Sequence, residues 1–114
     1  MVEHIKARGV LGLVYFHVPN SSKMGGKRTA SGVPLEAIRL KRLGFRKGVS
    51  DLVLLYCGRF FVLELKAQGG RPSDAQRQFL SDAAAQGAET SVAVGLDAAL
   101  HQLETWGLLR GRTL

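Results

Sequence analysis

The sequence predicts an α/β fold, and three patterns carry that prediction. Two apolar, strand-like runs at residues 51–56 and 59–66 are separated by Cys-Gly alone, which is the spacing of a tight antiparallel hairpin. The segment 73–76, Ser-Asp-Ala-Gln, has the form of a capping box and precedes an apolar stripe at helical spacing. Shorter strand-like and helix-like segments lie on either side. With 114 residues, 46% of them hydrophobic, the chain has the size of one domain, so we expect residues 1–114 to fold as a single unit.

The first half of the chain adds three elements and a loop to this hairpin. Residues 2–8 favour one or two turns of helix, and residues 13–18 favour a strand that ends before Pro19, which has no N–H to donate. The segment 20–32 is rich in glycine, serine and basic residues, so we expect a mobile basic loop there. Apolar residues at near-helical spacing predict a short basic helix that has Pro34 in its first turn and stops at Gly44.

The second half supplies the remaining elements. We expect the helix behind the capping box to end at Gly87, and the β-branched run 90–94 to form a short strand. Asp97 is expected to cap a final helix, which stops before Gly107 and is anchored on the core by Trp106. The resulting order is helix, strand, loop, helix, hairpin, helix, strand, helix.

The charge balance favours a polyanionic partner. Sixteen Lys and Arg against nine Asp and Glu give a net charge of +7. Half of the basic residues lie between positions 20 and 50, where Glu36 is the single acid, so this stretch is predicted to face phosphates; a generic solvated basic surface is the alternative. The basic residues of this stretch are Lys23, Lys27, Arg28, Arg39, Lys41, Arg42, Arg46 and Lys47.

The single cysteine and the absence of long apolar stretches exclude several classes of protein. Cys57 alone can form neither an internal disulfide nor a multi-cysteine zinc site, and a thiol in an apolar run is usually packed in the core. No stretch approaches the roughly 20 apolar residues of a membrane span, and the first residues lack the pattern of a secretory signal. We therefore expect a soluble cytoplasmic protein without a membrane partner.

Polar residues interrupt the hairpin where strands favour apolar ones. If the two-residue turn pairs position 56 with position 59, Asp51 falls opposite Glu64, and Glu64 and Lys66 project from one face. Two adjacent carboxylates repel unless a cation lies between them, and such hard oxygen ligands suit Mg²⁺ or Mn²⁺. Lys66 could then orient or deprotonate a water, or stabilise charge on the phosphate. The alternative is a cross-strand ion network without catalysis.

Four ordered blocks of sequence now indicate a family. They are His-Val-Pro-Asn at 17–20, Gly-Val-Ser-Asp at 48–51, Leu-Glu-Leu-Lys at 63–66, and Gly-Arg-Pro-Ser-Asp-Ala-Gln-Arg-Gln-Phe at 70–79. Asp, a hairpin, then Glu-x-Lys resembles the signature of the PD-(D/E)XK nuclease superfamily, and the flanking blocks resemble its VRR-NUC branch, the virus-type replication-repair nuclease domains. The resemblance implies a restriction-endonuclease-like core, in which helices flank a mixed central sheet.

The resemblance also implies residue roles. Asp51 and Glu64 would bind the metal with the main-chain carbonyl of Leu65, and Lys66 would be catalytic. Gln76 matches the motif glutamine on the following helix, but it is also the capping-box partner of Ser73, and the two roles compete for one side chain.

The N-terminal part of the motif set is less complete. Family members carry a metal-binding acid on an N-terminal helix, for which Glu3 is the only candidate unless Glu36 substitutes for it. His17 and Asn20 match the block at the end of the first strand, where contact with DNA and a structural hydrogen-bonding role are both open. With Lys23, Lys27, Arg28, Arg42, Arg46 and Lys47, these two residues complete the predicted DNA-binding set.

The expected function is therefore that of a Mg²⁺- or Mn²⁺-dependent DNA endonuclease, a hydrolase that cleaves phosphodiester bonds with metal-activated water. Lys and Arg contacts to phosphate predict preference for structure rather than base sequence. Stand-alone VRR-NUC domains resemble Holliday-junction resolvases, which implies a homodimer acting on branched DNA in DNA repair, in a phage or bacterial context. The alternatives are a DNA-binding module of the same fold with weak or no catalysis, or a nuclease that prefers other DNA or RNA structures.

Overall fold

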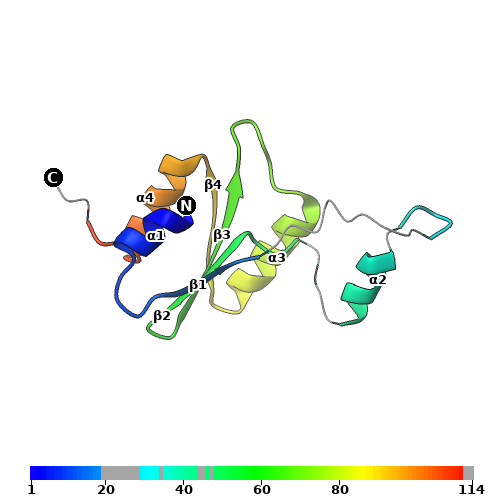
Figure 1. The fold of residues 1–114 in the computed structure, drawn as a ribbon, viewed down its shortest axis with the longest axis horizontal. Coiled ribbons are helices and arrows are strands. Elements are labelled where there is room, and N and C mark those ends of the chain that lie inside the picture. The colour runs from blue at the N-terminus through cyan, green and yellow to red at the C-terminus, as the bar shows by residue number, and fades with distance from the viewer. Residues whose placement is uncertain (19–28, 34, 44–45, 47, 112–114) are drawn as a thin grey trace.

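The computed structural model describes residues 1–18, 29–33, 35–43, 46 and 48–111 of the chain. Much of the basic loop predicted at 20–32 lies outside these residues, as do Asn20, Lys23, Lys27, Arg28 and Lys47. The described residues follow the predicted order of elements (Figure 1). These are α1 (Val2–Arg8), β1 (Val14–His17), α2 (Leu35–Arg42), β2 (Leu52–Tyr56), β3 (Arg59–Lys66), α3 (Asp74–Ala85), β4 (Glu89–Val94) and α4 (Leu96–Thr105).

The strands form a mixed four-stranded sheet in the order β1-β2-β3-β4. β1 and β3 pair antiparallel with β2, whereas β4 runs parallel to β3 and is reached through α3. The hairpin has the predicted register, because Tyr56 pairs with Arg59 across Cys57 and Gly58. Both turn residues have positive φ, 50° and 76°, as a type I′ turn requires. The predicted α/β class and mixed sheet are confirmed.

The hydrophobic core lies between one face of the sheet and the helices α1 and α4, which Figure 1 shows on the side opposite α3. Alternate residues of β2 and β3 point into it, as expected for strands with period-two burial. Trp106 packs on the core with its ring 5.2 Å from that of Phe61, which confirms its predicted role as an anchor. The most deeply buried core residues include Leu52, Leu54, Phe61, Leu63, Ala99, Leu103 and Leu108.

The other sheet face is only partly covered. α3 lies over it, but the helix has no fully buried residue. Toward the hairpin turn the same face exposes apolar side chains in cross-strand rows, because Val14 pairs with Leu55 and Leu55 with Phe60. Phe16 and Phe60 are 51% and 44% exposed. The core side of the sheet is therefore closed, and the α3 side is open at one end.

α2 lies apart from the sheet, beyond α3 in Figure 1. The molecule is correspondingly long, with extents of 57 × 29 × 22 Å and a radius of gyration of 16.0 Å. A compact chain of about 100 residues has a radius of gyration of about 13 Å. Where the chain returns from α2, the Arg46 guanidinium pairs with Asp82 at 2.6 Å and lies over the ring of Phe79. This anchor on α3 precedes Asp51 and β2 in the chain.

Two local predictions were wrong. The N-cap of α4 is Gly95, with no side-chain cap hydrogen bond, whereas Asp97 lies inside the first turn. Gly95 has φ 86°, and its N–H donates to the Lys66 carbonyl, so a contact with β3 fixes the start of the helix. Cys57 is exposed in the turn rather than packed in the core, because the turn places both of its residues outside the sheet. No helix among the described residues is long and apolar enough to cross a membrane.

Candidate active site

Asp51 lies just before β2 and is fixed by two hydrogen bonds. Its carbonyl accepts from the Val18 N–H at 2.8 Å, at the end of β1. Its carboxylate Oδ2 reaches across to β3 and accepts from the Leu65 N–H at 2.9 Å. Leu65 separates Glu64 from Lys66, so the Asp51 carboxylate is held beside both. The convergence predicted from the hairpin register is present.

Glu64 is the buried acid of this group, with 1% of its surface exposed. Its Oε1 accepts from Gln76 Nε2 at 2.8 Å and pairs with Lys66 Nζ at 3.3 Å. Its Oε2 is buried and has no hydrogen-bond partner among the described residues. Burial, and next the negative charge of Asp51, raise the pKa of Glu64 above its ordinary value, while Lys66 opposes the shift.

Gln76 joins α3 to this carboxylate. It is the third residue of α3, and the capping box is complete, since Ser73 Oγ accepts from the Gln76 N–H at 3.1 Å. In return, Gln76 Oε1 accepts from the Ser73 N–H at 2.8 Å, which leaves Nε2 free to donate to Glu64. The two ends of the amide therefore serve the cap and the Glu64 contact separately, and the catalytic role of Gln76 stays a prediction.

The donor set suits a divalent cation. Two carboxylates share one site, and the Glu64 oxygen without a partner is buried, where an unpaired acceptor is costly. A cation would satisfy that oxygen and offset the repulsion from Asp51, and hard oxygen donors are the ligands of Mg²⁺ and Mn²⁺. Within the described part of the chain no cluster of three Asp, Glu, His or Cys forms, so Glu3 is not brought to Asp51 and Glu64. The ligand role of the Leu65 carbonyl stays a prediction.

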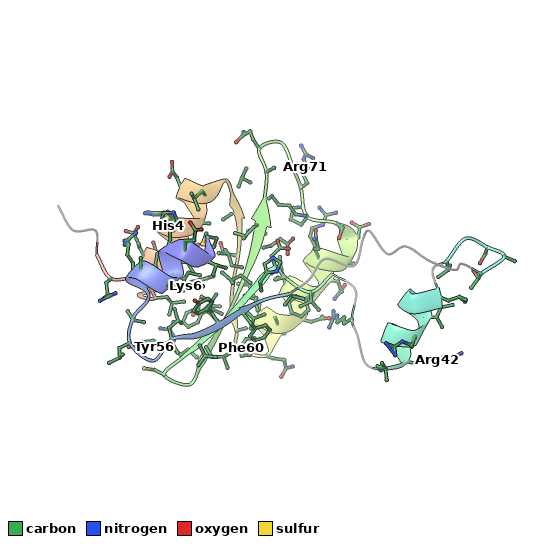
Figure 2. All side chains as sticks on the ribbon, viewed as in Figure 1. His4, Lys6, Arg42, Tyr56, Phe60 and Arg71 are labelled. Atoms are coloured by element: carbon green, nitrogen blue, oxygen red, sulfur yellow. The ribbon has the colours of Figure 1, made fainter. Side chains whose placement is uncertain are left out.

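The predicted DNA-binding residues with described positions are dispersed. His17 is exposed at the end of β1 and pairs in register with Leu52, the neighbour of Asp51. Arg42 is exposed on α2, far along the molecule from α1 and the hairpin turn (Figure 2). Arg46 is engaged with Asp82 and Phe79, so its guanidinium serves to anchor the chain on α3.

Sequence reasoning assigned no role to two residues within the family-like blocks. Gly48, the first residue of the block 48–51, packs directly against the backbone of α3, a long-range contact that the block itself does not reveal. Arg71 is exposed in the connection between β3 and α3 (Figure 2), and among the described residues it has no ion pair. The sequence signal for Arg71 was its position between Lys66 and the capping box.

Comparison with solved structures decides the fold. A structure named "VRR_NUC domain protein" superimposes with a TM-score of 0.60 at 23% sequence identity, covering 74% of this chain and 80% of that chain. The chain has the VRR-NUC fold. No family model matches the sequence, and no curated protein matches it. In the VRR-NUC fold of this chain, Asp51, Glu64 and Lys66 meet where β2 begins and β3 ends, beside the first turn of α3.

Proposed function

We propose that the chain is a divalent-metal-dependent endonuclease that hydrolyses DNA phosphodiester bonds, with its active site at Asp51, Glu64 and Lys66. The observation that carries the proposal is the buried Glu64, which faces a second carboxylate and keeps one oxygen without a partner among the described residues. A structural acid at such depth is normally fully hydrogen-bonded. The VRR-NUC fold supports the same conclusion.

Each side chain has a separate task in this proposal. Asp51 and Glu64 hold the cation, and Gln76 and the Leu65 N–H keep the two carboxylates in place. The cation, when bound, supplies Lewis-acid polarisation of the phosphate and lowers the pKa of the attacking water. Lys66, 20% exposed and tethered to Glu64, can donate a hydrogen bond to that water or to a phosphate oxygen.

The test is cleavage of labelled linear, nicked, flapped and four-way DNA with Mg²⁺, Mn²⁺ or EDTA. Asp51→Asn and Glu64→Gln should abolish cleavage and leave folding and most DNA binding intact, because each loses a ligand charge and little volume. Asp97→Asn, the same change at an exposed position in α4, is the control and should cleave as wild type. DNA binding without metal-dependent cleavage in the wild type would favour a non-catalytic binding module instead.

We further propose that the substrate is branched DNA such as a Holliday junction, processed during repair. Basic residues that contact phosphates read shape rather than base sequence, so a four-way junction should be cut faster than a linear duplex. Equal rates on the two substrates would rule out the junction preference and leave the nuclease activity standing. Faster cleavage of RNA in the same assay would assign the enzyme to RNA.

A homodimer completes the proposal, because a pair of sites could act on the two strands of a two-fold-symmetric junction. Leu103 of α4 is fully buried, and Trp106 and Leu13 pack on the core, so these three residues offer no dimer surface. Exposed apolar side chains of the described residues gather instead on the sheet face around Phe16 and Phe60. Light scattering at micromolar concentration should give twice the chain mass. A monomeric mass with efficient junction cleavage would refute the dimer.

A further inference from the structure

We propose that Gly48 is a positioning residue of the site. Its backbone sets how closely the first turn of α3 approaches the segment before β2, and thereby holds Gln76 within hydrogen-bonding distance of Glu64. The effect on cleavage rests on the proposed function, whereas the effect on the Gln76–Glu64 hydrogen bond does not depend on it.

The close approach at Gly48 involves backbone atoms on both sides. A Cβ at this position would lie 2.5 Å from both the carbonyl carbon and the oxygen of Ala75, and 2.8 Å from the Gln76 nitrogen. Backbone atoms cannot swing aside as the end of a flexible side chain can. Gly48 also has φ +86°, which L side chains rarely adopt. Other described glycines with positive φ, including Gly58 and Gly87, have nothing within 4 Å of such a Cβ.

The contact lies on the part of α3 that reaches Glu64. The Gln76 nitrogen that Gly48 approaches is the one held by Ser73 Oγ, and the Gln76 side chain is tied to Ser73 and Glu64 at its two ends. A displacement of this turn is therefore passed to the Glu64 contact. Asp51 is fixed separately, by the N–H groups of Leu65 and Val18, neither of which belongs to α3.

The expected displacement is large enough to matter. To bring a Cβ at position 48 from 2.5 Å to an ordinary contact at 3.4 Å, the two backbones must separate by about 0.9 Å. A similar shift of Gln76 would stretch its 2.8 Å hydrogen bond to Glu64 beyond the roughly 3.2 Å limit of a good N–H···O bond. The Asp51–Leu65 hydrogen bond should survive.

The first test reads this hydrogen bond by NMR in metal-free protein. In Gly48→Ala, the side-chain amide resonances of Gln76, assigned by their loss in Gln76→Ala, should move toward the values of a solvated amide. The Leu65 backbone amide should keep its wild-type shift. Gly87→Ala is the matched control, with φ +96° at the far end of α3 and open space around its Cβ, and it should leave the Gln76 resonances unchanged. Wild-type Gln76 resonances in Gly48→Ala would overturn the proposal.

A second variant keeps the test decisive if Gly48→Ala does not fold. Asparagine tolerates positive φ better than alanine, yet its Cβ meets the same backbone atoms of α3. Gly48→Asn should therefore reproduce the Gln76 shift at a smaller cost in thermal stability, with Gly87→Asn as its control. A folded Gly48→Asn variant with wild-type Gln76 resonances would equally refute the positioning role.

The third test is a double-mutant cycle on kcat with junction DNA. Gln76→Ala and Gly48→Ala should each lower kcat by about 10–100-fold, the usual effect of losing a group that orients a metal ligand. Because both act through one hydrogen bond, the double variant should be no slower than the slower single variant. Multiplicative losses would mean that Gly48 acts elsewhere. If the wild type does not cleave, the proposed function fails, while the NMR arm still decides the role of Gly48.

Discussion

At the residue scale, Glu64 shows what burying a candidate metal-binding acid costs the fold. Its carboxylate is removed from water and faces Asp51, and within the described part of the chain Lys66 and Gln76 are the side chains that compensate for this. The raised pKa means that, without a cation, the fold makes the charged form of this side chain less favourable than it is in water. A residue chosen for stability alone would be uncharged here, which is the usual conflict between an active site and its scaffold.

Glu64→Gln should therefore stabilise the metal-free protein. The amide keeps the shape of the side chain and can still accept from Gln76, but it removes the buried charge and the repulsion from Asp51. We expect a gain of about 1 kcal/mol in EDTA, or roughly 4 °C in Tm for a domain of this length, measured by circular dichroism. Mn²⁺ should raise the Tm of the wild type and not that of the variant. A lower Tm of the variant in EDTA would show that the Lys66 ion pair outweighs the repulsion.

Lys66→Met should separate metal binding from turnover. The ammonium binds no cation itself, and its positive charge opposes one, so calorimetry should find Mn²⁺ affinity equal to or above that of the wild type. Cleavage should be lost. Lys6→Met is the matched control, because Lys6 is exposed on α1, on the other side of the sheet (Figure 2). Loss of Mn²⁺ binding in Lys66→Met would make this lysine a structural residue.

At the scale of elements, the hairpin turn determines whether the two carboxylates meet. A slip of one residue would move Glu64 to the core face of β3, because side chains alternate along a strand. Cys57 occupies a left-handed position, φ 50°, where asparagine is preferred before glycine.

Cys57→Asn should therefore stabilise the fold without touching the site. We expect an increase of about 0.5–1 kcal/mol in the free energy of unfolding by urea, with unchanged kcat. Cys57→Val, which favours extended backbone, is the comparison and should destabilise the hairpin. If asparagine lowers stability, the thiol makes a contact in the folded state that the turn geometry does not reveal.

Local patterns account for most of the elements, and contacts between distant segments account for the errors. The capping box of Ser73 and Gln76 was predictable because both partners lie within one turn, and the hairpin register followed from a two-residue turn. The start of α4 was not predictable, since Gly95 is fixed by the Lys66 carbonyl. The pairing of Arg46 with Asp82 spans 36 residues and has no local signal.

The same distinction applies to the candidate site. Asp51, Glu64 and Lys66 could be found because strand periodicity alone places them together. Gln76 serves both the capping box and Glu64. This double role could not be predicted, because it depends on how α3 packs on the sheet. The packing of Gly48 could not be predicted, since it depends on where a helix more than twenty residues later comes to lie.

At the scale of the whole molecule, charge and shape together bear on the proposed binding of DNA. Several arginines of the described residues are engaged in ion pairs, among them Arg46 and Arg59. Arg42 is exposed on α2, at the far end of a molecule 57 Å long (Figure 2). A phosphate contact there would extend the proposed DNA-binding surface well beyond the carboxylates.

Arg42→Gln should weaken binding to all DNA sequences alike. Each lost phosphate contact reduces the slope of log affinity against log salt by about 0.9, which titrations at several salt concentrations can resolve. Arg59→Gln removes the same charge from the hairpin, where Glu89 already balances it, and should leave the slope unchanged. Equal slopes for the two variants would identify α2 as an ordinary solvated surface.

An isolated antiparallel bridge joins Gly9, which follows α1, to Leu109, which follows α4. The Arg110 N–H donates to the Arg8 carbonyl, and the Arg8 guanidinium donates back to the Arg110 carbonyl, so these two places in the chain are clasped together. The polypeptide between them forms a ring that is closed on the α1 and α4 side of the sheet, opposite α3 (Figure 1). Such a ring can be inserted into a host protein or circularly permuted without any linker crossing the carboxylates.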